Sequence, residues 1–109
     1  MTGQVEVVLY HRCDDEDRIV AAYHESSSRL AGTPGLLSDH LMRSSADPGV
    51  FTVVSRWRDQ AAFLAWEEGA AHKEQTAPLR PFRDLARPKP FEVNVVLSAH
   101  EAVVGTGAP

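Results

Sequence analysis

The stretch TPGLLSDHLMRSSADPGVFTVVSRW, residues 33–57, decides the fold of this 109-residue chain. Its last eight residues, Val50–Trp57, are rich in the β-branched and aromatic side chains that favour strands. Leu36–Arg43 has the length of a second strand, and residues 45–49 between the two carry the Asp, Pro and Gly that are typical of a turn. The stretch therefore predicts an antiparallel hairpin.

Further strand and helix patterns flank this hairpin on both sides. Residues 4–12 alternate apolar and polar side chains and predict a strand, and residues 15–31 repeat apolar side chains every three to four positions, as an amphipathic helix does. After the hairpin, Asp59 is placed to cap a second helix, which Gly69 bends or interrupts. Residues 91–98 predict the last strand.

The predicted order is β-α-β-β-α-β, which indicates an α+β, ferredoxin-like sandwich. We assign residues 1–100 to this one domain and residues 101–109 to a flexible tail. Two helices can cover only one face of a four-stranded sheet, so the other face must also be hidden from water. We therefore expect a homodimer in which two sheets pack face to face.

The amino-acid composition limits which binding partners and which cellular compartment we expect for this protein. The formal net charge of −4 argues against binding to nucleic acid or to an anionic membrane. No apolar run approaches the length of a membrane span, and the first residues do not resemble a signal peptide. The single cysteine, Cys13, excludes an internal disulfide and fits a reducing compartment, so we expect a cytoplasmic protein.

Three segments together resemble the antibiotic biosynthesis monooxygenase superfamily of dimeric α+β barrels. They are residues 33–57, RDQAAFLAWEEGAAH at 58–72 and PFEVNVVL at 90–97. The superfamily contains cofactor-free oxygenases that convert polyketide phenols to quinones, haem-degrading enzymes and proteins of unknown role. The resemblance implies an enzyme that oxidises a small aromatic substrate with molecular oxygen and uses neither metal nor flavin.

Aromatic residues at strand and helix spacing predict the substrate pocket. Trp57 and Ser55 share one face of the third strand, and Phe63 and Trp66 share one side of the second helix. If the two sets meet, they form an aromatic cleft that suits a flat ligand, although ordinary core packing gives the same pattern. We expect Ser55 or Tyr10 to orient a substrate oxygen.

Two histidines are candidates for the base that deprotonates the substrate. On an unbroken helix His72 lies more than 90° from the stripe of Phe63 and Trp66, so only a break at Gly69 turns it inward. His40 in the second strand is the alternative base. Histidine takes and releases protons near physiological pH, which suits this role. The histidine spacings do not predict a metal site.

Departures from the family pattern leave other functions open. Quinone-forming members carry an Asn and a Tyr around the substrate, and this sequence has Val53 and Phe63 at those positions. A polyketide cyclase without oxygenase activity, or a ligand-binding accessory protein of the same fold, is therefore the alternative. Haem degradation is disfavoured, because the first strand has no Asn and His72 follows too soon after Trp66.

Overall fold

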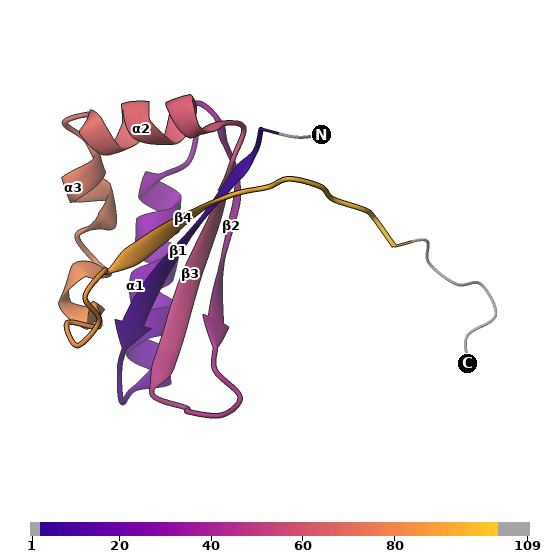
Figure 1. Cartoon of the computed structure of the whole chain (residues 1–109). Coiled ribbons are helices and arrows are strands. Elements are labelled where there is room, and N and C mark those ends of the chain that lie inside the picture. The colour runs from indigo at the N-terminus through magenta and orange to yellow at the C-terminus, as the bar shows by residue number, and fades with distance from the viewer. Residues whose placement is uncertain (1–2, 103–109) are drawn as a thin grey trace.

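Four antiparallel strands form one sheet in the order β2-β3-β1-β4, and the helices pack on one of its faces (Figure 1). The computed structural model describes residues 3–102. Sheet order and element order are those of a ferredoxin-like α+β domain, so the predicted fold class is confirmed. The elements are β1 (Val5–Arg12), α1 (Glu16–Arg29), β2 (Leu36–Arg43), β3 (Val50–Trp57), α2 (Gln60–Glu68), α3 (His72–Thr76), the short 3₁₀ helix η1 (Arg80–Phe82) and β4 (Phe91–Val95).

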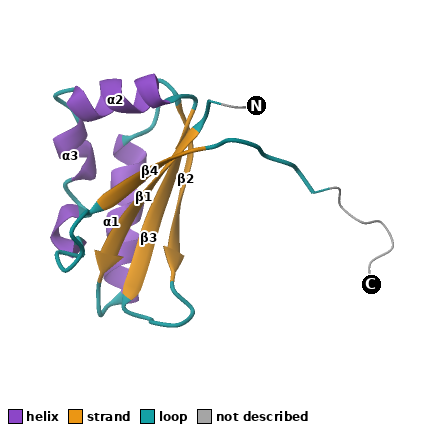
Figure 2. Cartoon of the chain, in the orientation of Figure 1, coloured by secondary structure: helices purple, strands orange, loops and turns teal. Residues whose placement is uncertain are grey.

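The core lies between the sheet and its helical layer, which Figure 2 shows in purple. Side chains alternate between the two faces of a strand, so every second residue of β1 and β3 points toward the helices. The helix-facing positions pair across the sheet: Val5 with Trp57, and Val7 with Ser55. Val5, Val7 and Trp57 are almost completely buried. This layer forms the floor beneath the helices.

Local capping contacts set the ends of the helices. The Asp15 carboxylate accepts the amide hydrogen of Arg18 at the start of α1, and the Asp59 carboxylate accepts that of Ala62 at 2.8 Å at the start of α2. The second contact holds the pKa of Asp59 below its usual value. Gly69 adopts an extended conformation and ends α2, and the chain restarts as α3 three residues later. The predicted interruption at Gly69 is therefore confirmed.

Gly35 permits a close approach between the start of β2 and helix α2. Its φ of +83° lies in the left-handed region, where residues with a Cβ are strained. A Cβ at this position would also overlap the Cβ of Ala62. The Gly35 carbonyl accepts the amide hydrogen of Arg58 at 2.7 Å, which ties the hairpin to the start of α2.

The last strand is shorter than the sequence predicts. It ends at Val95 rather than at residue 98, because its partner β1 begins at Val5 and Val5 pairs with Val95. One further bond joins the Val96 amide to the Gln4 carbonyl at 2.8 Å. Most of the tail expected from residue 101 lies outside the described residues.

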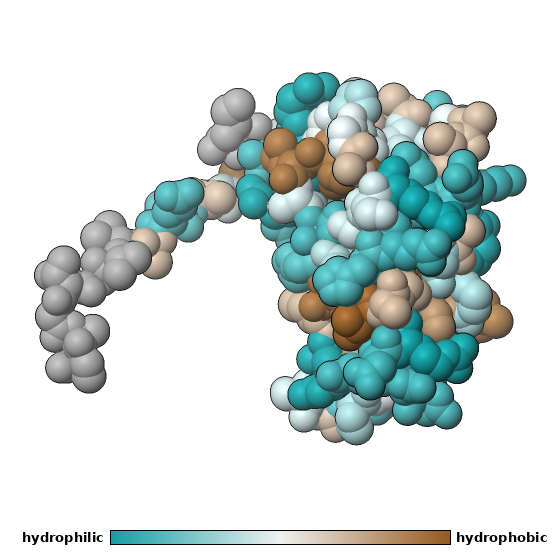
Figure 3. Space-filling view, turned by 180° about the vertical axis from the view of Figure 1, so that it is seen from behind, coloured by the Kyte–Doolittle hydropathy of each residue, from teal (hydrophilic) through white to brown (hydrophobic). Residues whose placement is uncertain are grey.

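The side turned away from the viewer in Figure 1 is mostly hydrophilic, with apolar side chains in small separate areas (Figure 3). It has the character of a surface that faces water. Within residues 3–102, no helix combines the length and the apolar character that a membrane crossing requires.

Candidate active site

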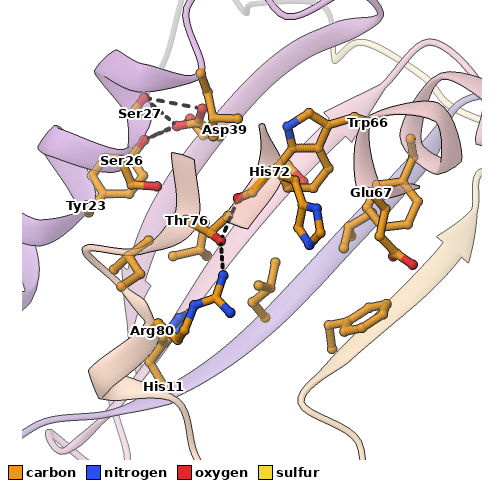
Figure 4. Close-up of a pocket in the computed structure, with 18 of the residues that line it drawn as sticks. His11, Tyr23, Ser26, Ser27, Asp39, Trp66, Glu67, His72, Thr76 and Arg80 are labelled. Atoms are coloured by element: carbon orange, nitrogen blue, oxygen red, sulfur yellow. Dashed lines mark hydrogen bonds between the residues drawn. The ribbon is translucent and has the colours of Figure 1, made fainter. Parts of the chain in front are cut away.

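A cavity of about 320 Å³ lies between the helix-facing side of the sheet and the helical layer. Side chains from all four strands and from α1, α2 and α3 line it (Figure 4). About half of the lining residues are polar or charged, but apolar atoms make up most of the cavity surface. This volume is at the lower end of the range for small-molecule sites. The arrangement fits a compact, largely apolar ligand.

An aromatic wall forms one side of the cavity. The Trp57 and Trp66 rings are 5.2 Å apart, and the Phe63 ring lies 5.6 Å from that of Trp57 in an edge-on contact. Phe91 of β4 extends the wall, with its ring 6.3 Å from that of Phe63. The structure thus brings the three aromatic residues singled out from the sequence together beside a void. Flat rings in tilted and edge-on contact provide a surface on which another flat ring can pack.

Ser55 provides a polar group on the cavity floor. Its Oγ accepts a hydrogen bond from the indole Nε1 of Trp57 at 2.9 Å. An indole nitrogen only donates, so the hydroxyl hydrogen of Ser55 remains available to a ligand. Ser55 lies where it can orient a ligand oxygen.

His72 enters the cavity because the helix breaks at Gly69. As the first residue of α3, its ring points into the cavity beside Trp66, with the two ring centroids 5.6 Å apart (Figure 4). Nδ1 of His72 lies 3.1 Å from the carbonyl oxygen of Gly69. Because a carbonyl only accepts, this contact assigns the proton of the neutral ring to Nδ1. Nε2 then carries a lone pair that can take a proton.

A hydrogen-bonded cluster on the α1 side adds a second polar region. The Tyr23 hydroxyl donates to the Asp39 carboxylate, and the Ser27 hydroxyl donates to the same carboxylate at 3.1 Å. Burial, together with the bond to Asp39, raises the pKa of Tyr23 to about 12. The Tyr23 phenol is therefore protonated at neutral pH, and the cluster is held in one arrangement.

His11 is a buried polar residue of the cavity that sequence reasoning did not single out. Only 1% of its surface is exposed, and its Nδ1 has no hydrogen-bond partner among the described residues 3–102. Burial lowers the pKa of His11 to about 4, and the neighbouring Arg83 charge acts in the same direction. The ring is therefore neutral at pH 7.

The low pKa of His11 predicts a loss of stability in mild acid. The pKa is 6.5 ordinarily and about 4 in the folded chain, so the unfolded chain binds the proton first as the pH falls. The stabilisation is complete above pH 6.5 and is lost toward pH 4, so we expect the free energy of unfolding to be about 2 kcal/mol lower at pH 5 than at pH 7. Urea unfolding at both pH values measures this loss. The His11→Gln variant should lack it, and an equal loss in that variant would assign it to another group.

The structure places His40 on the face of the sheet that points away from the cavity. Register slips between Leu36 and Ser38, where β2 bulges against β3. The bulge reverses the alternation, so that Asp39 pairs with Ser55 on the helix side and His40 pairs with Val54 on the far side. His40 therefore does not line the cavity, contrary to its candidacy as a base there.

Tyr10 also lies on the far face, where it is engaged by other residues. Its hydroxyl donates to the Glu92 carboxylate at 2.7 Å, and the Arg87 guanidinium stacks 3.5 Å from its ring centroid. The bond to Glu92 raises the pKa of Tyr10. Of the two residues expected to orient a substrate oxygen, only Ser55 lines the cavity.

Sequence reasoning missed two polar residues of the cavity, His11 and Asp39. The strand pattern could have predicted the first but not the second. His11 follows Val5, Val7 and Leu9 on the same strand face, so alternation alone would have placed it on the helix side. Asp39 reaches the cavity only because of the bulge, which no local pattern announces. Within residues 3–102, no group of three or more His, Cys, Asp or Glu side chains is arranged to hold a metal ion.

Sequence comparison relates residues 5–77 to a known family. The family model that matches them is described as antibiotic biosynthesis monooxygenase. Protein SchA of Streptomyces halstedii is 33% identical over 79 residues, which are 72% of this chain and 21% of SchA. The 42.8 kDa protein in the whiE locus of Streptomyces coelicolor is also 33% identical over 79 residues, 71% of this chain and 20% of that protein. The chain thus spans about a fifth of the length of these curated relatives.

Structural comparison supports the same fold. The crystal structure of SnoaB, described as a cofactor-independent oxygenase from Streptomyces nogalater, aligns with a TM-score of 0.68 and 13% identity. The alignment covers 93% of this chain and 97% of SnoaB. At this identity the likeness establishes the fold, and function has to be argued from the cavity.

Proposed function

Because the chain belongs to the antibiotic biosynthesis monooxygenase family, we propose that it is a cofactor-independent monooxygenase that oxidises an aromatic polyketide-type phenol to a quinone. The observation that carries the proposal is the His72 ring, with its Nδ1 against the Gly69 carbonyl, in a cavity walled by Trp57, Phe63 and Trp66. This contact leaves Nε2 to act as the base. A base and a flat apolar binding surface are what a phenol needs in order to react directly with oxygen.

The proposed reaction begins when His72 Nε2 takes the proton of a phenolic hydroxyl. The resulting anion transfers one electron to O₂, and the substrate radical and superoxide join through a new C–O bond. The proton on His72 passes to the peroxide and gives a hydroperoxide on a carbon that still carries one hydrogen. Neutral His72 then removes that hydrogen as a proton, and the C–H electron pair forms the carbonyl as the O–O bond breaks. The leaving hydroxide takes the proton from His72 and departs as water. At a ring CH₂ centre the balance is CH₂ + O₂ → C=O + H₂O.

In the proposed reaction, other cavity residues bind and orient the substrate. Ser55 donates to an oxygen of the substrate, since its hydroxyl hydrogen is not used by Trp57. The aromatic wall orients the rings and excludes water, which strengthens every electrostatic contact inside the cavity. Val53 and Phe63 add apolar contact but no hydrogen-bond donor.

A second candidate function follows from those two apolar positions. Val53 and Phe63 stand where quinone-forming relatives carry polar side chains, so a polyketide cyclase or a ligand-binding accessory protein of the same fold is the alternative. In that case the cavity binds the aromatic ligand, and His72 moves a proton without reaction with oxygen.

We further propose a cytoplasmic homodimer in which the open faces of two sheets pack together. Val8 pairs with Val54, and Met42 pairs with Thr52, on the face that carries no helix. The side chain of Met42 is substantially exposed in the single chain. Sedimentation velocity at micromolar concentration should give the mass of two chains, and a monomer would contradict this part of the proposal.

Oxygen consumption tests the proposed reaction directly. Purified, metal-free protein is mixed with an anthrone, and oxygen uptake is followed with an electrode while quinone formation is followed by absorbance. We expect one O₂ consumed for each quinone formed. Quenching of tryptophan fluorescence without oxygen uptake would favour the cyclase or accessory alternative. Failure to develop a Soret band on addition of haem would exclude haem turnover as the function.

A further inference from the structure

Two arginines line the cavity, the exposed Arg80 and the half-buried Arg83, and neither has a carboxylate partner within residues 3–102. Arg83 pairs with His11 through a short antiparallel bridge, so the two residues are neighbours on the cavity wall. The Arg80 guanidinium donates to the Thr76 hydroxyl at 3.0 Å and to the Lys73 carbonyl at 3.1 Å. Among residues 3–102, none of the ion pairs includes Arg80 or Arg83.

The same part of the cavity contains the unpartnered nitrogen of His11. Buried polar groups are nearly always hydrogen-bonded, so an orphaned ring nitrogen beside a void indicates a missing partner. Figure 4 shows His11 and Arg80 on the same side of the cavity, whereas Glu67 lies on the other side of His72. His11, Arg80 and Arg83 therefore share one part of the cavity wall.

We propose that His11, Arg80 and Arg83 form a subsite for a carboxylate carried by the aromatic substrate, an inference that rests on the proposed function. The planar guanidinium group presents several N–H donors in a fork that matches the two oxygens of a carboxylate. A neutral His11 with its proton on the unpartnered Nδ1 contributes one further donor inside the cavity. The proposed substrate is thus an aromatic acid, with its carboxylate toward β1 and η1 and its reacting ring against the tryptophans.

A carboxylate fits this subsite better than a phenolate does. A phenolate presents a single oxygen, and the one formed in the proposed reaction is generated at His72, which Figure 4 places apart from His11. Two arginines carry two positive charges, which a permanently ionised acid group offsets before any proton transfer occurs. The subsite therefore selects and orients the substrate and takes no part in the bond changes.

Ligand binding tests this subsite without turnover. The probes are anthraquinone-2-carboxylate and its neutral amide, which have the same rings and are already oxidised. Quenching of Trp57 and Trp66 fluorescence reports occupancy of the cavity, because both indoles line it. We expect the acid to bind about 10- to 100-fold more tightly than the amide, as charge-assisted hydrogen bonds do in other sites.

Substitutions in the proposed subsite test which residues cause the tighter binding of the acid. Arg80→Gln and Arg83→Gln should each reduce the preference for the acid severalfold, and the double variant should abolish it. His11→Gln should weaken binding of the acid more than binding of the amide. Arg43→Gln is the matched control, because it removes the same charge from an exposed side chain that pairs with Glu16 and does not line the cavity. Circular dichroism shows whether each variant is folded.

The outcomes separate this subsite from the oxygenase proposal. Equal affinity of the wild-type protein for acid and amide overturns the subsite, even if anthrones are oxidised. A full preference retained in the folded double variant overturns it as well. A preference that follows Arg80 and Arg83, in a protein that consumes no oxygen, supports the subsite and contradicts the oxygenase.

Discussion

Replacement of His72 by Gln should lower the rate of anthrone-dependent oxygen uptake by about 100- to 10,000-fold, the usual contribution of a positioned general base. Glutamine preserves a polar side chain of similar size but cannot take up a proton at neutral pH. The side chain is half-buried and makes one backbone contact, to the Gly69 carbonyl. We therefore expect the fold to survive and the affinity for the anthraquinone probes to change little.

Two further histidine variants make the His72 result specific. His24→Gln is the matched control, because this residue is exposed on α1 and does not line the cavity. Its activity should equal that of the wild-type protein. His40→Gln separates the two candidate bases, since His40 points away from the cavity. Loss of activity in His40→Gln, with normal activity in His72→Gln, would contradict the assignment of the base.

Local sequence was sufficient to predict much of the fold. The bounds of β2 and β3 agree with the prediction at both ends, because strand propensity and the turn between them act within a few residues. Asp59 caps α2 as expected. These features need no knowledge of distant contacts, and the order of elements then leaves few possible topologies.

The position of His72 shows where local reasoning stopped. Gly69 indicated a break but not the direction in which the chain would continue. That direction depends on contacts distant in sequence: the Ser26 hydroxyl donates to the Gln75 carbonyl at 2.8 Å, and the Gln75 amide donates to the Arg29 carbonyl at 3.1 Å. These bonds hold α3 against α1 and thereby turn His72 inward. A helical projection of the sequence contains none of this information.

Asp39, rather than His40, lies on the cavity side of β2, and local sequence could not predict this either. One extra residue in a strand inverts every side chain beyond it, so a single bulge near Ser38 reversed the expected face of β2. The bulge lies next to Gly35, where β2 approaches α2 too closely for a Cβ. The bulge therefore places the candidate base on the face away from the cavity, although the bounds of the strand were predicted correctly.

Truncation of Trp57 to Ala should cause the largest loss of stability among substitutions in the cavity wall. Its indole is 1% exposed and contacts Phe63 and Trp66, and its Nε1 donates to Ser55. Removal of a buried indole costs about 3–5 kcal/mol through lost contacts and the void that remains. Since domains of this size are stable by about 5–15 kcal/mol, the urea midpoint should fall steeply.

Matched variants distinguish loss of the ring from loss of its hydrogen bond. Trp57→Phe keeps one aromatic ring but removes the Nε1 donor to Ser55 and part of the buried ring volume, so it should lose less stability than Trp57→Ala. Trp66→Ala should also lose less, because Trp66 is only partly buried at the cavity wall. Urea titration followed by circular dichroism ranks the three. If Trp57→Ala unfolded at the wild-type midpoint, Trp57 would not be part of the core, and the wall proposed to hold the substrate would lack its support.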